Sequence, residues 1–309
     1  MGILISSVYE DKDSCYLCPV CNVEVRDVCY EYTEGEKPGD CKERLRIYRC
    51  GQCGFLFARP TVENSQMDSI DDAELFNSPL LKKLYEKLIV GREIFHARKI
   101  LGKKPSSLLD VGCGTGWIAK IWKEHGFDVV GLEPSSSRGD VARQRYGIKI
   151  IPDRIENLGI EKKYDVIVMR HVIEHFREPY EVLVKLRSLL REGGIIIITV
   201  PNIDCVGRIL FGARWSWILP YHCNFFNPQT LSQILDRAGF SILKSYQVPS
   251  PLWYPESLGR LIPDINVIES KIFRNNPAAL MLPFMPVVLL GYVTHYSDNI
   301  TVVGKSKES

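Results

Sequence analysis

The sequence predicts an α/β protein in which a small cysteine-rich module precedes a doubly wound sheet of seven strands. Three observations support this prediction. From residue 106 onward, apolar strands alternate with helical segments, which is typical of a mainly parallel sheet with helices on both faces. The first of these strands runs into a glycine-rich turn at residues 112–116. Seven of the ten cysteines lie before residue 54, in a stretch with few large apolar residues.

The cysteine-rich stretch contains two Cys-x-x-Cys pairs. Two residues between thiolates allow one backbone turn to present both sulfurs to a tetrahedral ion. We therefore predict a structural zinc site of zinc-ribbon type, whose four ligands are Cys18, Cys21, Cys50 and Cys53. Zinc binding can contribute on the order of 10 kcal/mol to the folding of such a segment. Three further cysteines could each replace a ligand or stay free: Cys15, Cys29 and Cys41.

We expect three segments along the chain. Residues 1–60 form the zinc-binding module, and residues 61–105 form a connector followed by a helix. Residues 106–309 hold the sheet, with an insertion at about 249–298 before the last strand.

The elements are expected in a regular order. A long helix is expected at 79–101, since Pro79 suits a first turn and Gly102 suits a stop. The strands are expected near 107–111, 128–132, 148–151, 164–169, 194–200, 241–248 and 299–304. Helices are expected near 116–125, 136–146, 179–191 and 229–238.

The glycine-rich turn is the first candidate for a binding site. The buried strand ends in Asp110, and Gly112, Gly114 and Gly116 follow at alternate positions. Glycine permits backbone angles that side chains forbid and lets a ligand approach the main chain closely. A helix that begins at about Thr115 would direct unpaired N–H groups at that ligand.

A second strand ends in another acid, Glu133, seventeen residues after Gly116. In doubly wound folds an acid at this place accepts hydrogen bonds from ribose hydroxyls. Trp117 stands where the dinucleotide-binding pattern has its third glycine. The pattern therefore favours a nucleoside without a diphosphate over a dinucleotide.

These motifs resemble those of class I S-adenosylmethionine-dependent methyltransferases. The resemblance rests on Asp110–Gly116, on Gly131–Ser135 and on the fourth strand at Tyr164–Met169, and it covers roughly residues 75–250. It implies a Rossmann-like sheet that an antiparallel hairpin closes, and a helix before the first strand that covers the cofactor. It also implies that S-adenosylmethionine is held by Asp110, Gly112, Cys113, Gly114, Gly116, Glu133 and Pro134, with Arg170 or His171 beside its methionine part.

The fourth strand leads into a second candidate site. His171, Glu174 and His175 are spaced so that they would project toward one pocket. A zinc peptidase carries a similar pattern on a helix, but this segment follows a strand and shows no third ligand. A purely structural role at the strand end is the alternative. With Pro179 and the Gly193-Gly194 pair, the segment resembles a methyltransferase subfamily that acts on sugars, quinones and other small metabolites. Some deoxysugar C-methyltransferases of this kind also carry an N-terminal zinc module.

Two later segments could line an acceptor pocket. The fifth strand ends in Pro201-Asn202, which is either simple turn chemistry or part of the pocket wall. An aromatic cluster with His222 follows at 211–226. A hydrophobic wall with a few polar groups is what a small-molecule site requires.

The insertion contains a strongly apolar run at 277–293. A membrane span needs about 20 residues, and Pro283 and Pro286 would interrupt its helix, so no transmembrane span is expected. A buried lid or a homodimer surface is favoured, and peripheral contact with a bilayer or a lipid-linked substrate is the alternative.

Composition narrows the class of protein. A chain of 309 residues that is 45% hydrophobic and 25% charged, with a net charge of +2, is typical of a globular protein without a nucleic-acid footprint. Ten cysteines without an export signal suggest a cytoplasmic protein with reduced thiols or metal ligands.

The predicted function is methyl transfer to a sugar or another small metabolite, at carbon or oxygen, with a nucleotide-linked or lipid-linked acceptor left open. His175 is the candidate base, and His222 and Glu174 are expected to support it. Two alternatives remain: an RNA base methyltransferase, which the near-neutral charge weakens, and a non-catalytic protein that binds S-adenosylmethionine.

Overall fold

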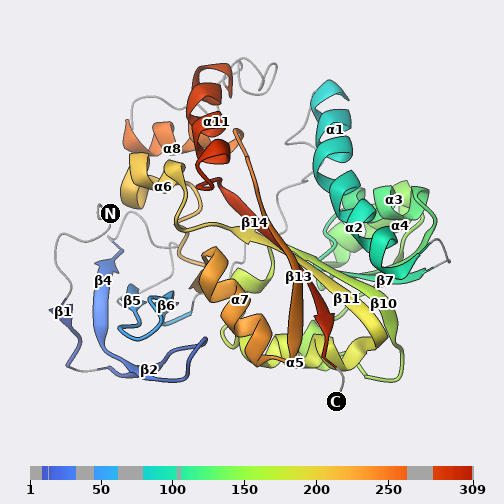
Figure 1. Ribbon diagram of the computed structural model, residues 1–309, viewed down its shortest axis with the longest axis horizontal. Helices are drawn as coiled ribbons and strands as arrows, with labels where there is room; N and C mark the ends of the chain where they lie inside the picture. The colour runs from blue at the N-terminus through green and yellow to red at the C-terminus, as the bar shows by residue number, and fades with distance from the viewer. Residues whose placement is uncertain are drawn as a thin grey trace.

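The computed structural model describes residues 9–12, 14–32, 45–61, 79–102, 106–262 and 281–307. At its centre lies a seven-stranded sheet with the order β13-β14-β11-β10-β7-β8-β9 (Figure 1). Its strands are β7 (Ser106–Val111), β8 (Phe127–Leu132), β9 (Lys149–Ile151), β10 (Tyr164–Arg170), β11 (Leu190–Pro201), β13 (Phe240–Val248) and β14 (Asn299–Ser306). β14 runs antiparallel to both neighbours, and the other pairs are parallel. The predicted Rossmann-like sheet is confirmed.

Helices cover both faces of this sheet because its strands are apolar on both sides. Neighbouring residues such as Leu108 and Leu109 point into different layers. The layer around Leu108 contains α2 (Gly91–Leu101), α3 (Trp117–Glu124) and α4 (Ser136–Tyr146). The layer around Leu109 contains α5 (Pro179–Leu189) and α7 (Pro228–Arg237). The two layers lie on different sides of the strands in Figure 1.

α7 shows how local sequence sets these helices. Asn227 Oδ1 accepts a hydrogen bond from the backbone N–H of Thr230 at 2.8 Å, and Thr230 Oγ1 accepts one from the N–H of Asn227 at 3.0 Å. This reciprocal capping box satisfies two helix-terminal donors. Leu231, Ile234 and Leu235 then recur at helical spacing and are all buried against the sheet.

The helical segment at 79–101 has the expected bounds but is not one uniform helix. α1 (Pro79–Tyr85) and α2 are joined by a π-helical turn at Glu86–Val90. The backbone N–H of Gly91 donates to the carbonyl of Glu86, which is the wider hydrogen-bond spacing of a π-turn. Such turns frequently accompany functional sites, and this one lies directly before the buried Glu93.

The N-terminal module has a five-stranded sheet with the order β1-β4-β5-β6-β12. Its strands are β1 (Tyr9–Glu10), β4 (Asp27–Glu31), β5 (Arg46–Arg49), β6 (Leu56–Arg59) and β12 (Asn224–Phe225). A separate hairpin pairs β2 (Tyr16–Leu17) with β3 (Glu24–Val25). β12 comes from the second half of the chain and pairs antiparallel with β6. The module is therefore joined by backbone hydrogen bonds to the segment that follows His222.

The apolar segment at 277–293 is described from residue 281 onward. A short 3-10 turn at Leu282–Phe284 precedes α11 (Met285–Val293), which packs on α6 (Val206–Phe211) beside α8 (Trp253–Leu261) (Figure 1). Within the described ranges, no helix combines the length and the apolar character of a membrane span. The exposed large apolar side chains in the described part of this segment are Leu282, Leu289, Leu290, Tyr292 and Val293.

Candidate active site

The glycine-rich turn joins β7 to α3 at the carboxyl ends of the parallel strands. Gly112, Gly114 and Gly116 adopt φ angles of +69°, +56° and +82°. A Cβ atom on Gly112 would lie 2.5 Å from a methyl group of Val172, and one on Gly116 would lie 2.7 Å from the Cβ of Ala142. Both backbone angle and close packing therefore require glycine at the first and third positions.

The turn is fixed to the neighbouring strand β8. The backbone N–H groups of Gly112 and Cys113 donate to the carbonyl of Leu132 at 2.8 and 3.3 Å. The Cys113 side chain is buried so tightly against Gly131 that a Cβ there would lie 2.4 Å from its sulfur. Burial raises the pKa of the Cys113 thiol, so Cys113 contributes packing and a backbone donor rather than charge.

Glu133 follows β8 and reaches back to the turn. Its Oε2 accepts a hydrogen bond from the backbone N–H of Gly114 at 2.8 Å, and its Oε1 accepts one from the N–H of Ser135 at 3.0 Å. A carboxylate has about four lone-pair sites, so these two bonds leave acceptor capacity for a ribose hydroxyl. The intervening Pro134 is exposed.

Asp110 is the second acid at the turn and is buried. Its Oδ2 makes no hydrogen bond within the described part of the chain. Burial is the main cause that raises the pKa of Asp110 to about 7, with smaller contributions from the nearby Glu93 and Glu133 and against the lowering effect of Arg170. An orphaned acid of this kind fits a ligand that brings positive charge, and S-adenosylmethionine carries both an ammonium and a sulfonium group.

This geometry predicts proton release on ligand binding. Between about pH 4 and pH 7 folded Asp110 holds a proton that the unfolded chain would lose, so its contribution to stability falls as pH rises through this window. A cation beside it would favour the carboxylate. Binding of S-adenosylmethionine should therefore release up to one proton near pH 6.5. Calorimetry in buffers of different ionisation enthalpy measures this release, which Asp110→Asn should abolish.

Arg170 ends β10 and is engaged inside the protein. It forms a buried ion pair with Glu93 of α2 and donates to the hydroxyl of Tyr85 at 2.5 Å. Burial alone would lower the pKa of Arg170, but Glu93 and Tyr85 raise it above its ordinary value. Arg170 therefore ties the covering helical segment to the sheet. Glu93 escaped the sequence analysis, although an acid at helical spacing from Ile89 and Ala97 on an apolar stripe was a usable signal.

The predicted histidines and Glu174 lie together. Ligand atoms of Glu174, His175 and His222 lie within 4.8 Å of one another, although His222 is distant in sequence. His171 has a positive φ of 53°, and its Nδ1 lies 3.7 Å from Glu174 Oε1. Burial, with a smaller contribution from His175, lowers the pKa of His222 to about 3, which favours a neutral ring near pH 7.

An aromatic wall borders this cluster. Trp217 stacks on His171 at 4.8 Å and on His222 at 5.7 Å between ring centroids, and Trp253 packs against it at 4.6 Å. Trp253 lies in the insertion, where the sequence analysis assigned no site residue. Asn202, by contrast, forms a local turn, which is one of the two predicted alternatives, because its Oδ1 accepts a hydrogen bond from the backbone N–H of Asp204 at 3.1 Å. Its side-chain N–H donates to the carbonyl of Ser297 at 2.8 Å.

The two Cys-x-x-Cys turns converge at the module. The Sγ atoms of Cys18 and Cys53 lie 3.6 Å apart, those of Cys21 and Cys50 lie 3.4 Å apart, and all four lie within 4.8 Å. Zinc with bonds of about 2.3 Å to four sulfurs separates those sulfurs by roughly 3.8 Å, so the donor set fits. Burial raises the pKa of Cys18 to about 12, and a cation would be needed to hold it as a thiolate.

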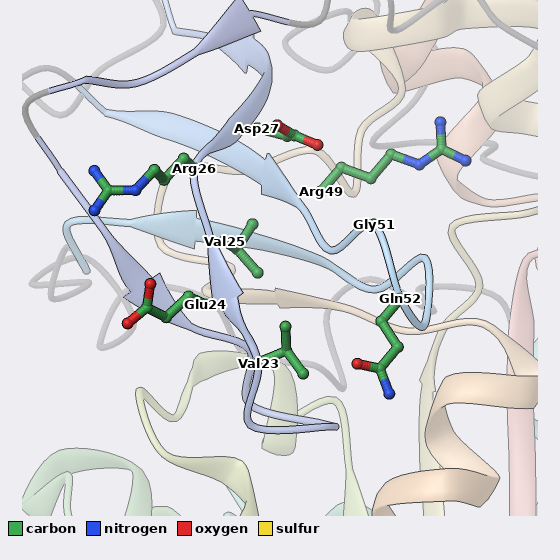
Figure 2. A pocket seen from close by; sticks show the side chains of 8 residues that line it. All are labelled: Val23, Glu24, Val25, Arg26, Asp27, Arg49, Gly51 and Gln52. Atoms are coloured by element: carbon green, nitrogen blue, oxygen red, sulfur yellow. The ribbon is translucent and has the colours of Figure 1, made fainter.

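The three remaining cysteines of the module do not join this group where they are described. Cys15 is exposed, and buried Cys29 donates its thiol to the carbonyl of Ile47 at 3.3 Å. Cys41 lies outside the described residues. A surface pocket of about 300 Å³ lies beside the second Cys-x-x-Cys turn (Figure 2). Its lining mixes Arg26 and Arg49 with acids and includes no residue of the glycine turn or the histidine cluster.

Comparison with known proteins identifies the family. A family model described as a methyltransferase domain matches residues 85–245, which is more than half of the chain. The ubiquinone biosynthesis O-methyltransferase of Rickettsia bellii is 27% identical over 147 residues, covering 44% of this chain and 61% of the relative. The enzyme of that name from Cereibacter sphaeroides is 27% identical over 180 residues, covering 53% and 72%.

A solved structure shares the fold. It comes from Galdieria sulphuraria and carries a provisional assignment as a sarcosine dimethylglycine methyltransferase. The TM-score is 0.52 at 15% identity, over 80% of this chain and 92% of that one. The chain spans about 61% of the length of the first of the curated relatives. The matched domain, the strand order and the glycine turn together show that this chain belongs to the class I S-adenosylmethionine-dependent methyltransferases.

Proposed function

We propose that this protein transfers a methyl group from S-adenosylmethionine to a small metabolite, with a sugar as the favoured acceptor. One observation carries the proposal: the first glycine of the cofactor turn packs directly against Val172, in the loop that bears Glu174 and His175. The proposed donor turn is thus in contact with the loop that bears two of the proton-accepting groups. The curated relatives that act in ubiquinone biosynthesis support a small-molecule acceptor.

On the donor side, the residues of the turn would hold the cofactor. Backbone N–H groups at the start of α3, the remaining lone pairs of Glu133 and the unpartnered Oδ2 of Asp110 are complementary to its hydroxyl and cationic groups. His171 is the group that we place beside the methionine part, and Arg170 would act there through the covering helix that it holds. When bound, S-adenosylmethionine supplies an electrophilic methyl group.

On the acceptor side, the chain would position the nucleophile and promote loss of its proton. Alignment of two reactants can be worth about 7–11 kcal/mol of the activation barrier. His175 donates a hydrogen bond from Nδ1 to the carbonyl of Tyr221 at 3.2 Å. Its Nε2 is then the ring nitrogen that would accept the proton of the acceptor. The low pKa of His222 makes it a weak base, so its role would be support and orientation. Trp217 forms the apolar wall.

His175→Ala should lower kcat by about 10²–10⁴-fold while the affinity for S-adenosylmethionine stays unchanged, because the histidine acts on the acceptor side. The measurement is transfer of a labelled methyl group to the acceptor found in a screen that begins with deoxysugar nucleotides and catechols. His295→Ala, at an exposed histidine, is the matched control. Wild-type kcat in His175→Ala would exclude this role.

We also propose that the four converging cysteines hold a structural zinc ion, which leaves no open coordination position for chemistry. The exposed apolar side chains of α11 fit two of the predicted roles, which are contact with a second copy of the chain and contact with a lipid-linked acceptor.

The first test of the whole proposal is calorimetric titration with S-adenosylmethionine and S-adenosylhomocysteine. Absence of binding to either would remove its basis.

A further inference from the structure

Three metal-ligating side chains meet at the acceptor side of the candidate site, away from the cysteine cluster. They are Glu174 and His175, in the 3-10 turn after β10, and His222, which precedes β12. Their ligand atoms lie within 4.8 Å of one another, and Glu174 and His222 are buried. The sequence analysis set a zinc role for the segment at 171–175 aside because it found no third ligand, and His222 is not adjacent in sequence.

Both histidine rings are oriented as metal ligands usually are. His175 Nδ1 lies 3.2 Å from the carbonyl oxygen of Tyr221, and His222 Nδ1 lies 2.9 Å from that of Trp217. A carbonyl can only accept, so each Nδ1 carries the proton and donates it. In the neutral ring each Nε2 then keeps a lone pair. A backbone carbonyl on the second ring nitrogen is the usual support of a histidine that binds a metal.

Glu174 provides an independent observation that points to a cation. Its side chain is 1% exposed, and neither carboxylate oxygen has a hydrogen-bond partner within the described ranges. The nearest positively chargeable atom, His171 Nδ1, lies 3.7 Å away, beyond hydrogen-bond distance. A buried carboxylate without hydrogen bonds is costly unless a cation or a metal ion compensates it. In their neutral rings, Nε2 of His175 and Nε2 of His222 carry no proton and cannot donate a hydrogen bond to the Glu174 carboxylate.

The two segments that bear these ligands are held in place by the backbone. The N–H of Cys223 donates to the carbonyl of Glu174 at 2.8 Å, and the Cys223 thiol lies 3.4 Å from the carbonyl of His175. Asn224 Nδ2 donates to the carbonyl of Phe176 at 2.6 Å. The ligand set is therefore preorganised across two distant parts of the chain, as a metal site requires.

We propose that Glu174, His175 and His222 form a second metal site, for a divalent transition ion of the zinc type. Two imidazoles and one carboxylate are the ligands that zinc, cobalt and ferrous iron accept, whereas calcium and magnesium prefer oxygen alone. Three protein ligands leave a coordination position open. The site is thus built for an exogenous ligand, in contrast to the closed four-cysteine site.

The role of this ion rests on the proposed function. An acceptor hydroxyl that occupies the open position would lose its proton to solvent more readily, because the cation stabilises the oxyanion. That oxygen then forms a bond with the methyl carbon as the carbon–sulfur bond breaks, and the electron pair returns to sulfur in neutral S-adenosylhomocysteine. In this form of the mechanism His175 promotes proton loss as a metal ligand and does not take the proton itself.

The test titrates Co²⁺ into the full-length protein that carries a single equivalent of zinc, which the four thiolates bind in preference, and follows binding by calorimetry and visible absorption. We expect one equivalent of Co²⁺ to bind, with bands of nitrogen and oxygen ligation and without sulfur-to-cobalt bands. Glu174→Gln and, separately, His222→Ala should weaken this binding by roughly tenfold or more. His295→Ala should leave it unchanged. Catechol added to the wild-type Co²⁺ form should shift the visible bands if the open position takes an oxygen ligand.

The possible results separate the inference from the proposed function. Failure of the wild type to bind the further equivalent, or equal binding by Glu174→Gln with an unchanged melting temperature, would overturn the metal site. Should His222→Ala not fold, His175→Gln replaces it. An intact Co²⁺ site in a protein that binds no S-adenosylmethionine would support the metal site and refute the proposed function. If catechol leaves the visible bands of the Co²⁺ form unshifted, the role of the ion in binding the acceptor is wrong, but the metal site itself stands.

Discussion

Gly114→Arg should abolish binding of S-adenosylmethionine while the chain stays folded. Gly114 has a φ of +56°, in the left-handed region where a side chain costs about 1–2 kcal/mol, and its N–H donates to Glu133 at 2.8 Å. An arginine side chain at this position would occupy the space in which we expect the ligand to approach the main chain. We expect affinity to fall at least about 100-fold, which corresponds to roughly 2.7 kcal/mol.

The measurement is calorimetric titration of wild type and variant with S-adenosylmethionine, together with a melting curve of each. Gly159→Arg is the matched control, because a Cβ at exposed Gly159 has its nearest neighbour at 3.8 Å and needs no positive φ. The control should bind like the wild type. Binding by Gly114→Arg within a few-fold of wild type would show that the ligand does not approach this turn, and the roles given to Asp110 and Glu133 would lose their support.

The local parts of this site were accessible from the sequence because they depend on short-range rules. Glycine spacing predicted the turn, and alternating apolar strands predicted the sheet, because neighbouring positions such as Leu108 and Leu109 serve opposite layers. The largest difference in a strand is at β11, which begins at Leu190, before the expected residue 194, because Leu190 pairs with Tyr164 of β10. Such pairing depends on the partner strand and has no signal within β11 itself.

The long-range parts were not accessible in the same way. Nothing in the order of residues placed Glu93 against Arg170, since that ion pair forms only when α2 packs on the sheet. The sequence analysis singled out His222 and Glu174 separately, but their proximity depends on how the chain after β11 returns to the cluster. The pairing of β12 with β6, which joins the module to this return, was likewise hidden because β12 is only two residues long.

That pairing gives the cysteine module a consequence for the acceptor side. The N–H of Ala58 donates to the carbonyl of Cys223 at 2.9 Å, immediately after His222. Buried Arg59 donates from Nη2 to the carbonyl of Arg177 at 2.8 Å, and its Nη1 lies 3.4 Å from the carbonyl of Cys223. One side chain of the module thus holds both segments that carry the cluster. The glycine turn, by contrast, is fixed by β8 and α4.

Cys50→Ser should therefore disable the acceptor side and spare the donor side. Loss of a ligand removes much of a zinc contribution on the order of 10 kcal/mol, so β5 and β6 should open. We expect the structural zinc to be lost, methyl transfer to fall at least about tenfold, and affinity for S-adenosylmethionine to stay within about threefold. Hydrogen exchange should accelerate at 173–177 and 221–227 but not at 108–116. This readout needs no knowledge of the acceptor.

Cys15→Ser is the matched control, because Cys15 is an exposed cysteine of the same module outside the four-sulfur group. It should keep its zinc, its exchange pattern and its activity. Two results would contradict the coupling. Exchange at 173–177 that stays slow after zinc loss would show that the cluster is held without the module. Equal acceleration at 108–116 would show that the module supports the whole fold, and the separation of donor and acceptor sides would then be wrong. Selective acceleration would instead assign the zinc module a defined part in the enzyme, since Arg59 would be the link between metal loading and the geometry of His175 and His222.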